Sequence, residues 1–296
     1  LTHHYTTGLS TIEVASNNVD KMLLEFSRFF EEGKKNPSGK YTAYIISKTN
    51  NKDKIKDLKN WLDTNGIEHG LASTSKSIKG FSYLKGKTEQ LKVSKGDMII
   101  SAKQAKSVLV QILFEPETTL RDTLTYDITA WSIPYVFGLE SYAVKSDIKY
   151  SNAQYFSPRN EIVDQSPYAY LLPWKGINDV RFLANLFKND IVSRVSEEPF
   201  SIEGREFDRG TLVITRKGNE KHGSKFDEII KKAGKKLDRT LVAVNTGFVS
   251  KGKDFGSSSM RVVKRPKIGL VSGDGVSSSR YGEVWHFFER QIEFPV

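Results

Sequence analysis

Two short stretches, Tyr41-Thr-Ala-Tyr-Ile-Ile-Ser47 and Pro167-Tyr-Ala-Tyr-Leu-Leu-Pro173, decide the fold of this 296-residue chain. Each is an apolar run of strand length bounded by polar or turn-forming residues, a pattern that is typical of a buried β-strand. When Ala43-Tyr44 is aligned with Ala169-Tyr170, the segments that follow the two stretches also agree in order and type. The agreement predicts a duplicated lobe.

The order of elements defines the fold class. The first stretch is followed by a charged helix closed by Asn65-Gly66, a short strand, a turn-rich β-ribbon, a strand over 97–101 and an apolar helix over 105–114. The second is followed by a helix over 179–187, a strand over 210–215, a helix over 226–237 and a last strand over 240–244. This alternation predicts an α/β protein with two duplicated lobes, whose sheets are largely parallel or mixed and carry helices packed against them.

The same patterns divide the chain. We expect an N-terminal helical lead-in over 1–38, a first α/β lobe over 39–116, an aromatic-rich connector over 117–166, a second α/β lobe over 167–248, and a linker with the start of a further α/β domain over 249–296. The lead-in is an amphipathic helix with apolar residues from Leu9 to Phe30, ending near Gly33.

The last segment predicts a truncation. Lys267–Ser272 has the pattern of a buried strand, Gly273–Ser279 that of a loop, and Tyr281–Ile292 that of a helix. One strand and one helix cannot enclose a core of their own. Because the chain also begins at Leu1 rather than Met, we expect a fragment of a longer protein.

Composition excludes several classes. The absence of cysteine excludes disulfides, cysteine-type zinc sites, iron–sulfur clusters and thiol nucleophiles, and it leaves the redox compartment open. The apolar residues occur in short runs, which excludes a membrane-spanning helix. The chain holds 45 Lys and Arg against 35 Asp and Glu, a net charge of +10.

The positive charge is concentrated. Between Arg216 and Lys267 there are 15 Lys and Arg against 5 Asp and Glu, so this segment accounts for the whole excess. Concentrated charge of this kind favours an acidic ligand or polyanion. Aromatic residues able to stack on bases are scarce there, which argues against nucleic acid.

The connector is dense in aromatic side chains, with Tyr126, Trp131 and Tyr135 at its centre. So many rings on a loop or short helix are typical of a contact between domains. A groove that binds peptide is the alternative.

Two motifs near the C-terminus suggest ligands. Gly273, Gly275, Ser277 and Ser278 lie where a strand would give way to a helix, so their backbone N–H groups are suited to a phosphate or carboxylate. Serine caps alone explain the same residues. His286 and Glu289 have the H-x-x-E spacing of zinc peptidases, but no histidine follows them and the other four have no partner at ligand spacing. The sequence therefore predicts no catalytic residue and no metal ligand in this chain.

Four longer strings resemble the region that follows the peptidase domain in large bacterial zinc carboxypeptidases. They are Leu113-Phe-Glu-Pro116, Tyr126-Asp-Ile-Thr-Ala-Trp-Ser-Ile-Pro134, Gly247-Phe-Val-Ser-Lys-Gly-Lys-Asp-Phe-Gly-Ser-Ser-Ser259 and Gly282-Glu-Val-Trp-His-Phe-Phe-Glu289. The stretch that begins at Lys267 is similar to the start of a glutamine amidotransferase-like domain, although it lacks a cysteine nucleophile.

The resemblance implies a secreted or periplasmic parent protein that removes C-terminal residues from peptides with a zinc-bound water. The family's zinc ligands, arginine clamp and general-base glutamate match no position here, and His286 and Glu289 fall in the later domain. This chain is then a non-catalytic accessory region without a cofactor of its own, whose partners are the parent's peptidase domain and its peptide substrate. The alternative is an independent module that binds an acidic ligand through residues 216–267.

Overall fold

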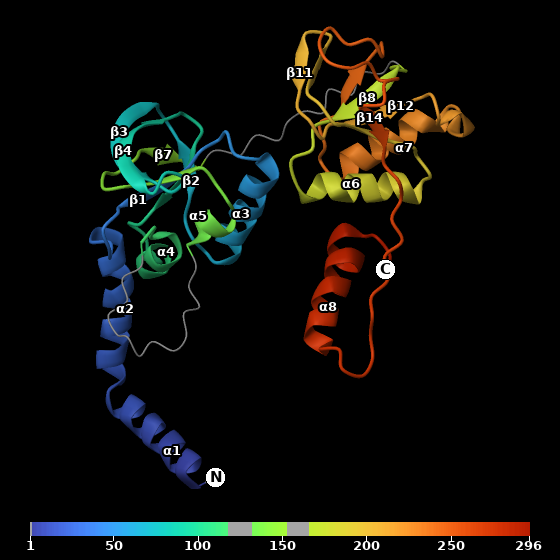
Figure 1. Cartoon of the computed structure of the whole chain (residues 1–296). Coiled ribbons are helices and arrows are strands. Elements are labelled where there is room, and N and C mark those ends of the chain that lie inside the picture. Colours follow the sequence, from blue (N-terminus) through green and yellow to red (C-terminus); the bar gives the residue numbers. More distant parts are fainter. Residues whose placement is uncertain (1, 118–131, 153–165) are drawn as a thin grey trace. The chain divides into compact units, whose positions relative to one another are not determined.

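The computed structural model describes residues 2–117, 132–152 and 166–296, which belong to two compact units, Leu1–Tyr155 and Phe156–Val296 (Figure 1). Each unit contains a β-sheet with helices packed against it. This combination confirms the predicted α/β class.

The first unit is built around a seven-stranded sheet with the strand order β4-β3-β6-β1-β5-β2-β7. Its strands are β1 (Ala43–Ile46), β2 (Gly70–Ala72), β3 (Lys76–Ser82), β4 (Lys87–Val93), β5 (Met98–Ser101), β6 (Ser141–Val144) and β7 (Tyr150–Ser151). Its helices are α1 (Thr2–Asn17), α2 (Val19–Lys35), α3 (Lys52–Thr64), α4 (Ser107–Phe114) and α5 (Ile133–Val136).

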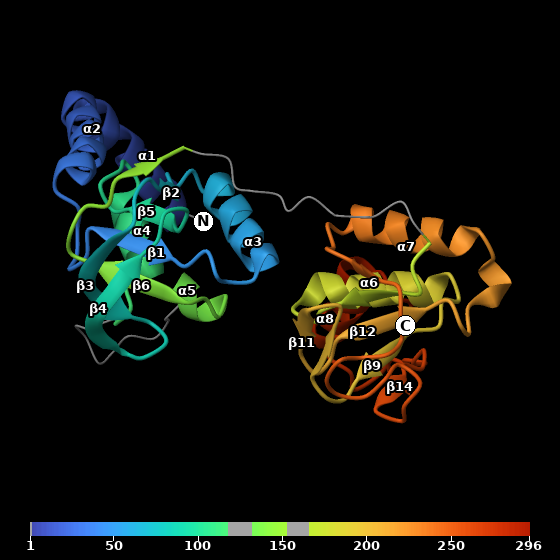
Figure 2. The same ribbon diagram turned by 90° about the horizontal axis from the view of Figure 1, so that it is seen from above.

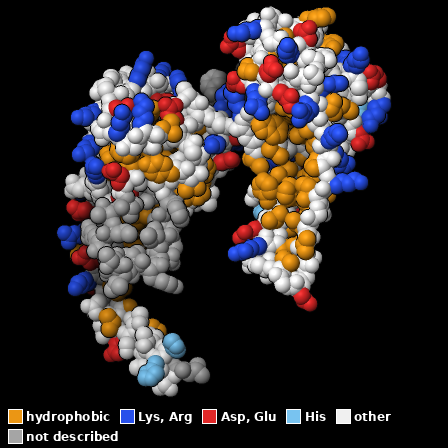
Figure 3. Space-filling model, in the orientation of Figure 1, with side chains coloured by type: hydrophobic (Ala, Val, Ile, Leu, Met, Phe, Trp, Pro, Cys, Tyr) orange, Lys and Arg blue, Asp and Glu red, His pale blue; other side chains and the backbone are white. Residues whose placement is uncertain are grey.

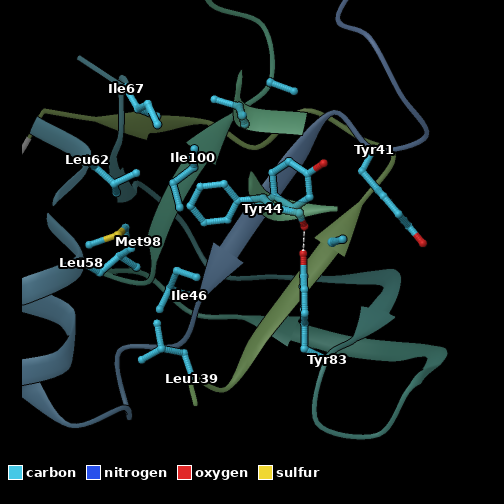
Figure 4. Close-up of a cluster of buried hydrophobic side chains, with 14 of the residues drawn as sticks. Tyr41, Tyr44, Ile46, Leu58, Leu62, Ile67, Tyr83, Met98, Ile100 and Leu139 are labelled. Atoms are coloured by element: carbon cyan, nitrogen blue, oxygen red, sulfur yellow. Dashed lines mark hydrogen bonds between the residues drawn. The ribbon is translucent and has the colours of Figure 1, made fainter. Parts of the chain in front are cut away.

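Strand β1 is buried on both faces because it lies inside the sheet and both faces are covered. Tyr44 and Ile46 face α3 and α4, where they pack with Leu58, Leu62, Val110 and Phe114. Ala43 and Ile45 face the opposite side, where Leu91 and Val93 of the β3–β4 hairpin cover them. Figure 4 shows the helix side of this core, where the dashed line from the Tyr83 hydroxyl marks its hydrogen bond to Phe114 O. The alternation of the two sets follows from the two-residue period of a strand.

The second unit holds a five-stranded sheet with the order β13-β8-β12-β9-β14 and a separate hairpin, β10–β11. Its elements are β8 (Ala169–Leu172), α6 (Ile177–Lys188), β9 (Arg194–Ser196), β10 (Phe200–Ile202), β11 (Arg205–Phe207), β12 (Leu212–Thr215), η1 (Glu220–His222), α7 (Lys225–Lys236), β13 (Val242–Val244), β14 (Met260–Val262), α8 (Ser278–His286) and the π-helical turn η2 (Phe287–Ile292). Helices α6 and α7 lie on one side of the sheet (Figure 2). The hairpin covers the other side with Phe200, Ile202 and Phe207.

The two sheets are copies of one design. The order β6-β1-β5-β2-β7 in the first unit corresponds strand for strand to β13-β8-β12-β9-β14 in the second. A buried side-chain amide is repeated as well. Gln104 accepts a hydrogen bond from Glu68 N, in the loop before β2, and donates to Glu68 O and to Ser101 O at the end of β5. Asn219 makes the same three contacts with Val192 N, Val192 O and Thr215 O. The duplication therefore extends to single hydrogen bonds.

The strand pairing corrects the expectation of largely parallel or mixed sheets. Every pairing between the described strands is antiparallel. Strands β1 and β2 do run in the same direction across helix α3, as a β-α-β order requires, but β5 lies between them and runs the opposite way. Because the chain reverses direction between β2 and β5, β5 inserts between the two parallel strands of the β-α-β unit. The alternation of strands and helices in the sequence does not reveal this insertion.

Several predicted elements occur with shifted bounds. The predicted lead-in helix is two helices, α1 and α2, with a turn at Asn18. The predicted β-ribbon is the β3–β4 hairpin. Residues 133–151 of the predicted connector supply α5, β6 and β7 to the first unit, and β14 adds part of the predicted linker to the second sheet.

The predicted buried strand over Lys267–Ser272 is wrong. These residues have no regular secondary structure, and most of their side chains are exposed. An apolar run becomes a strand only when a neighbouring strand pairs with it, and none of the strands in the described part of the chain does so. The helix predicted after this run does form, as α8 followed by η2.

Among the described residues, no helix combines the length and the apolar character that crossing a membrane requires.

Candidate functional site

One surface of the first unit exposes far more apolar area than a solvated helix normally does. Five large apolar side chains form a stripe along α2, which we call the α2 apolar face: Val19, Met22, Leu23, Phe26 and Phe29. Each is between 51% and 67% exposed. Their spacing of three and four residues places them on one side of the helix. Contiguous apolar patches on folded surfaces are typical of interaction surfaces, so the α2 apolar face is the first candidate site.

The C-terminal end of α2 is fixed to the first unit. Gly33 is buried against α4, where an added Cβ would lie 3.0 Å from Gln104 O and from Ser107 Cβ. Ser107 also anchors the following turn, because its Oγ accepts a hydrogen bond from Ser38 N at 3.3 Å. The absence of a side chain at position 33 lets the two helices approach. The α2 apolar face is thus held by a rigid contact at one end.

A shallow groove of about 230 Å³ continues the α2 apolar face onto α4. Its lining is apolar apart from one lysine: Phe29, Phe30, Ala105, Lys106, Val108, Leu109 and Ile112. The ring of Phe30 contacts both Phe26 and Phe29, at centroid distances of 4.9 and 5.2 Å. The three rings form one aromatic cluster at the edge of the groove.

The opposite side of α2 is polar. Glu31 and Lys34 form an exposed ion pair at 2.6 Å, which lowers the pKa of the Glu31 carboxyl through the hydrogen bond and charge of Lys34. Arg28 lies 3.9 Å from Glu25 on the same helix. Pairs of this kind keep one side of α2 in water and leave the apolar side for contact.

A second apolar surface lies on the second unit, over α6 and α8 (Figure 3). Ile292 and Phe294 are buried against α6, where the rings of Phe187 and Phe294 pack edge-on with their centroids 6.2 Å apart. Val284, Trp285 and Phe287 on the same segment are about two-fifths exposed. The helix therefore covers α6 with one side and presents apolar groups to solvent with another.

The predicted anion loop lies at the start of α8 in open surroundings. Gly273 and Gly275 have positive φ angles of 112° and 84°, and neither has another protein atom within 4 Å of its Cβ position. Ser277 is the N-cap residue, but its side chain makes no capping hydrogen bond, and Ser278 begins the helix. The loop presents backbone N–H groups, and no hydrogen bond among the described residues joins a basic side chain to it. Its role as an anion site stays a prediction.

His286 and Glu289 do not form a metal site with any third group that the structure describes. His286 ends α8 and is exposed, whereas Glu289 lies in η2 and accepts a hydrogen bond from Val296 N at 3.4 Å. The change from α- to π-helix between them also alters the one-face geometry that the H-x-x-E spacing requires. Among the described residues, this pair therefore does not fit zinc.

The predicted aromatic contact is described at one of its three residues. Tyr135 lies on α5, is 48% exposed, and packs edge-on against Tyr83 at 5.1 Å. Burial raises the pKa of the Tyr135 hydroxyl. Tyr83 in turn donates a hydrogen bond to Phe114 O in the core. Tyr126 and Trp131 lie outside the described residues.

The basic segment is less one-sided in space than in sequence. Five of its cations pair with carboxylates, and four of those carboxylates come from outside the segment: Lys221 with Asp190, Lys236 with Glu293, Arg239 with Asp179, Arg261 with Glu197, and Arg216 with Asp227 inside it. A surface hollow on α7 is lined by Lys231, Lys232 and Lys235 but also by Asp227 and Glu228. These contacts reduce the local excess of positive charge.

Two of these pairs stabilise the second unit. Asp179 is almost wholly buried and accepts hydrogen bonds from Lys175 N, Gly176 N and the Arg239 guanidinium, so it both caps α6 and binds the chain before β13. Asp227 accepts two bonds from Arg216 and one from the Tyr170 hydroxyl, all at 2.6–2.7 Å. Both ion pairs therefore hold separate elements of the second unit together.

Sequence reasoning identified α2 as amphipathic but did not identify its apolar face as a surface. The signal was present, because apolar residues continue at three- and four-residue spacing to Val19, well before any segment that packs against them. A helix that covers a core buries its apolar stripe within its own domain. The spacing of the apolar residues reveals the stripe, whereas the fold shows that α4 packs against the C-terminal end of α2.

Comparison of the chain with protein-family models, with curated proteins and with solved structures gave no match. The resemblance to zinc carboxypeptidases therefore stays a prediction from the sequence.

Proposed function

We propose that this chain is a non-catalytic docking region of a secreted or periplasmic protein that resembles zinc carboxypeptidases. In this proposal the α2 apolar face contacts the peptidase domain, which removes C-terminal residues from peptides. The stretch from Lys267 leads into an amidotransferase-like domain of the same protein, and the duplicated lobes hold the two neighbours at fixed surfaces.

One observation carries the proposal: five large apolar side chains on a single helix are each more than half exposed while the end of that helix is fixed to α4. Fully burying a side chain of this size stabilises a complex by about 1.5–3 kcal/mol relative to leaving it in water. A partner that covers three of them gains enough to offset part of the entropy lost on association.

The environment of the polar residues supports the same reading. The most buried charged side chain, Asp179, is used in an ion pair and a helix cap, and the buried amides of Gln104 and Asn219 are used in loop contacts. Groups that perform chemistry lie instead at a cleft, with unused hydrogen-bonding capacity toward a substrate.

The test compares the intact gene product with residues 1–296 alone. Zinc content and the release of C-terminal amino acids from peptides are measured for both. We expect stoichiometric zinc and exopeptidase activity in the intact product, and neither in residues 1–296. Stoichiometric zinc or activity in residues 1–296 would overturn the proposal, as would an intact product without either.

A further inference from the structure

Strand β13 is an edge strand of the second sheet, whereas the corresponding strand of the first sheet, β6, lies inside its sheet. Strand β13 is the last strand of the order β13-β8-β12-β9-β14. Its counterpart β6 pairs with β1 on one side and with β3 on the other. None of the described strands pairs with the outer side of β13. Within the described part of the chain, the corresponding edge is therefore paired in the first sheet and unpaired in the second.

The hydrogen-bonding groups at the open edge can be assigned. Arg216 N donates to Tyr168 O, so Tyr168 and, two residues on, Tyr170 direct their backbone groups to β12. Ala169 and Leu171 then direct theirs to β13, where they pair with Val244 and Val242. Because directions alternate along a strand, the N–H and C=O of Ala243 point away from the sheet.

The neighbouring residue confirms this direction. Asn245 N, two residues beyond Ala243, donates to Glu203 Oε1 at 2.8 Å on the outer side of β13. In the first unit the matching residue, Ala143, pairs with Phe81 of β3. Ala243 thus holds the position at which an added strand would bond.

The hairpin of the second unit does not occupy this edge. Its turn at Glu203 and Gly204 is left-handed, with φ angles of 48° and 72°. The hairpin lies over the face of the sheet, where Phe200 and Phe207 pack with Val244. It reaches the edge through the Glu203 carboxylate alone among the described contacts. Among the described residues, this difference leaves Ala243 without the strand partner that Ala143 has in the first unit.

The first unit shows which side chains a strand presents when it pairs with this edge, because β3 pairs with β6 there. There β3 places Gly80 opposite Val144 and Phe81 opposite Ala143. A Cβ at Gly80 would lie 2.7 Å from Val144 Cγ1, so a small residue is required at that point. Phe81 is 5% exposed, so the small Ala143 leaves space for a large ring. The second unit repeats both receiving residues, as Val244 and Ala243.

We propose that the outer edge of β13 binds an extended segment of another polypeptide as an added antiparallel strand, with a small residue opposite Val244 and a large apolar residue opposite Ala243. Strand addition of this kind derives affinity from backbone hydrogen bonds and specificity from alternate side chains. The Glu203 carboxylate ends the pairing beyond Ala243. This binding site goes beyond the docking function proposed for α2 and does not depend on it.

The probe is a blocked peptide with the sequence of β3 and its flank, Lys76-Ser-Ile-Lys-Gly-Phe-Ser-Tyr83. Its saturable binding to the whole chain is measured by fluorescence anisotropy, and protection of the Ala243 amide by hydrogen exchange. Two N-methylated peptides discriminate the mode. Methylation at the position of Phe81 removes a donor that faces the receiving strand, whereas methylation at the position of Ser82 removes one that faces away.

We expect the first methylation to weaken binding at least tenfold and the second to change it less than about threefold, with slower exchange at Ala243 in the complex. Equal effects of the two methylations, unchanged exchange at Ala243, or no saturable binding of the unmodified peptide would each overturn the proposal.

Discussion

Buried amides at matched positions show how far the two lobes share one solution. Gln104 and Asn219 differ in length, yet each joins the loop after a helix to the end of the neighbouring central strand. Both side chains are about 2% exposed. A buried backbone N–H or C=O that loses its partner costs about 1–3 kcal/mol. Such positions are therefore sensitive to any change that keeps the volume but removes the amide.

Replacing either amide by leucine tests this equivalence. We expect Gln104→Leu and Asn219→Leu each to lower the free energy of unfolding by about 1–3 kcal/mol, since the backbone groups bound by each amide lose their partner. Urea denaturation followed by far-UV circular dichroism gives the values. A loss below about 0.5 kcal/mol in both variants would show that the repeated contact does not stabilise the lobes.

The pairing of Asp227 with Arg216 makes the second unit sensitive to acid. Burial raises the pKa of Asp227, but hydrogen bonds from Arg216 and Tyr170 and the charge of Arg216 outweigh it, so that the pKa is lowered overall. A carboxyl whose pKa is lower in the folded state stabilises the fold above its unfolded pKa, about 3.9, and this contribution is lost as pH falls through the folded value.

We therefore expect Asp227→Asn to destabilise the second unit by about 1–3 kcal/mol at pH 7, and the difference from the unchanged protein to be smaller at about pH 3, because the contribution begins to fall once the pH is below the unfolded pKa of about 3.9. Chemical denaturation at both pH values measures it. Asp274→Asn, in an exposed loop, is the control and should change little at either pH. A difference that is the same at both pH values would contradict the assignment.

At the scale of elements, periodicity predicted most of the helices and strands because the apolar patterns are local. The strands of residues 41–47 and 167–173 and the helices α3, α6 and α7 appear within a few residues of their predicted bounds. The pairing of strands was not predictable in this way, because β5 inserts between β1 and β2 through contacts distant in sequence. For the same reason Lys267–Ser272 resembles a buried strand in composition, although none of the described strands pairs with it.

The candidate site was predictable only in part. The apolar spacing of α2 is visible in the sequence, and Tyr135 was selected for its aromatic surroundings. Exposure is a property of the folded surface, however, and neither the α2 apolar face nor the open edge of β13 follows from local pattern. The charge of residues 216–267 is partly paired in space for a related reason, since Asp179, Asp190, Glu197 and Glu293 pair with it from elsewhere.

The junction between α2 and α4 depends on one missing side chain. A valine at position 33 would bring its Cβ to 3.0 Å from Gln104 O, so the helices must separate. We expect Gly33→Val to destabilise the first unit by about 1–3 kcal/mol and to speed proteolysis between α2 and β1. Gly8→Val, where no atom lies within 4 Å of the Cβ position, is the matched control. Equal protease sensitivity of the two variants would contradict the described junction.

The whole molecule contains two units, each with its own buried core on both faces of its sheet. Domains with separate cores commonly unfold as separate cooperative units. We expect calorimetry to resolve two transitions, with Gln104→Leu lowering the temperature of one and Asn219→Leu that of the other. A single transition that both variants shift equally would show that the units unfold together.

The docking function is tested most directly by the affinity of this chain for the separately purified peptidase domain of the intact gene product. The account predicts saturable binding that Phe26→Lys weakens at least tenfold, about 1.4 kcal/mol. Val271→Lys changes a residue that is 81% exposed on the second unit, and it should leave the affinity within about twofold. Absence of binding, or an affinity that Phe26→Lys leaves unchanged, would contradict the central claim that the α2 apolar face is a docking surface.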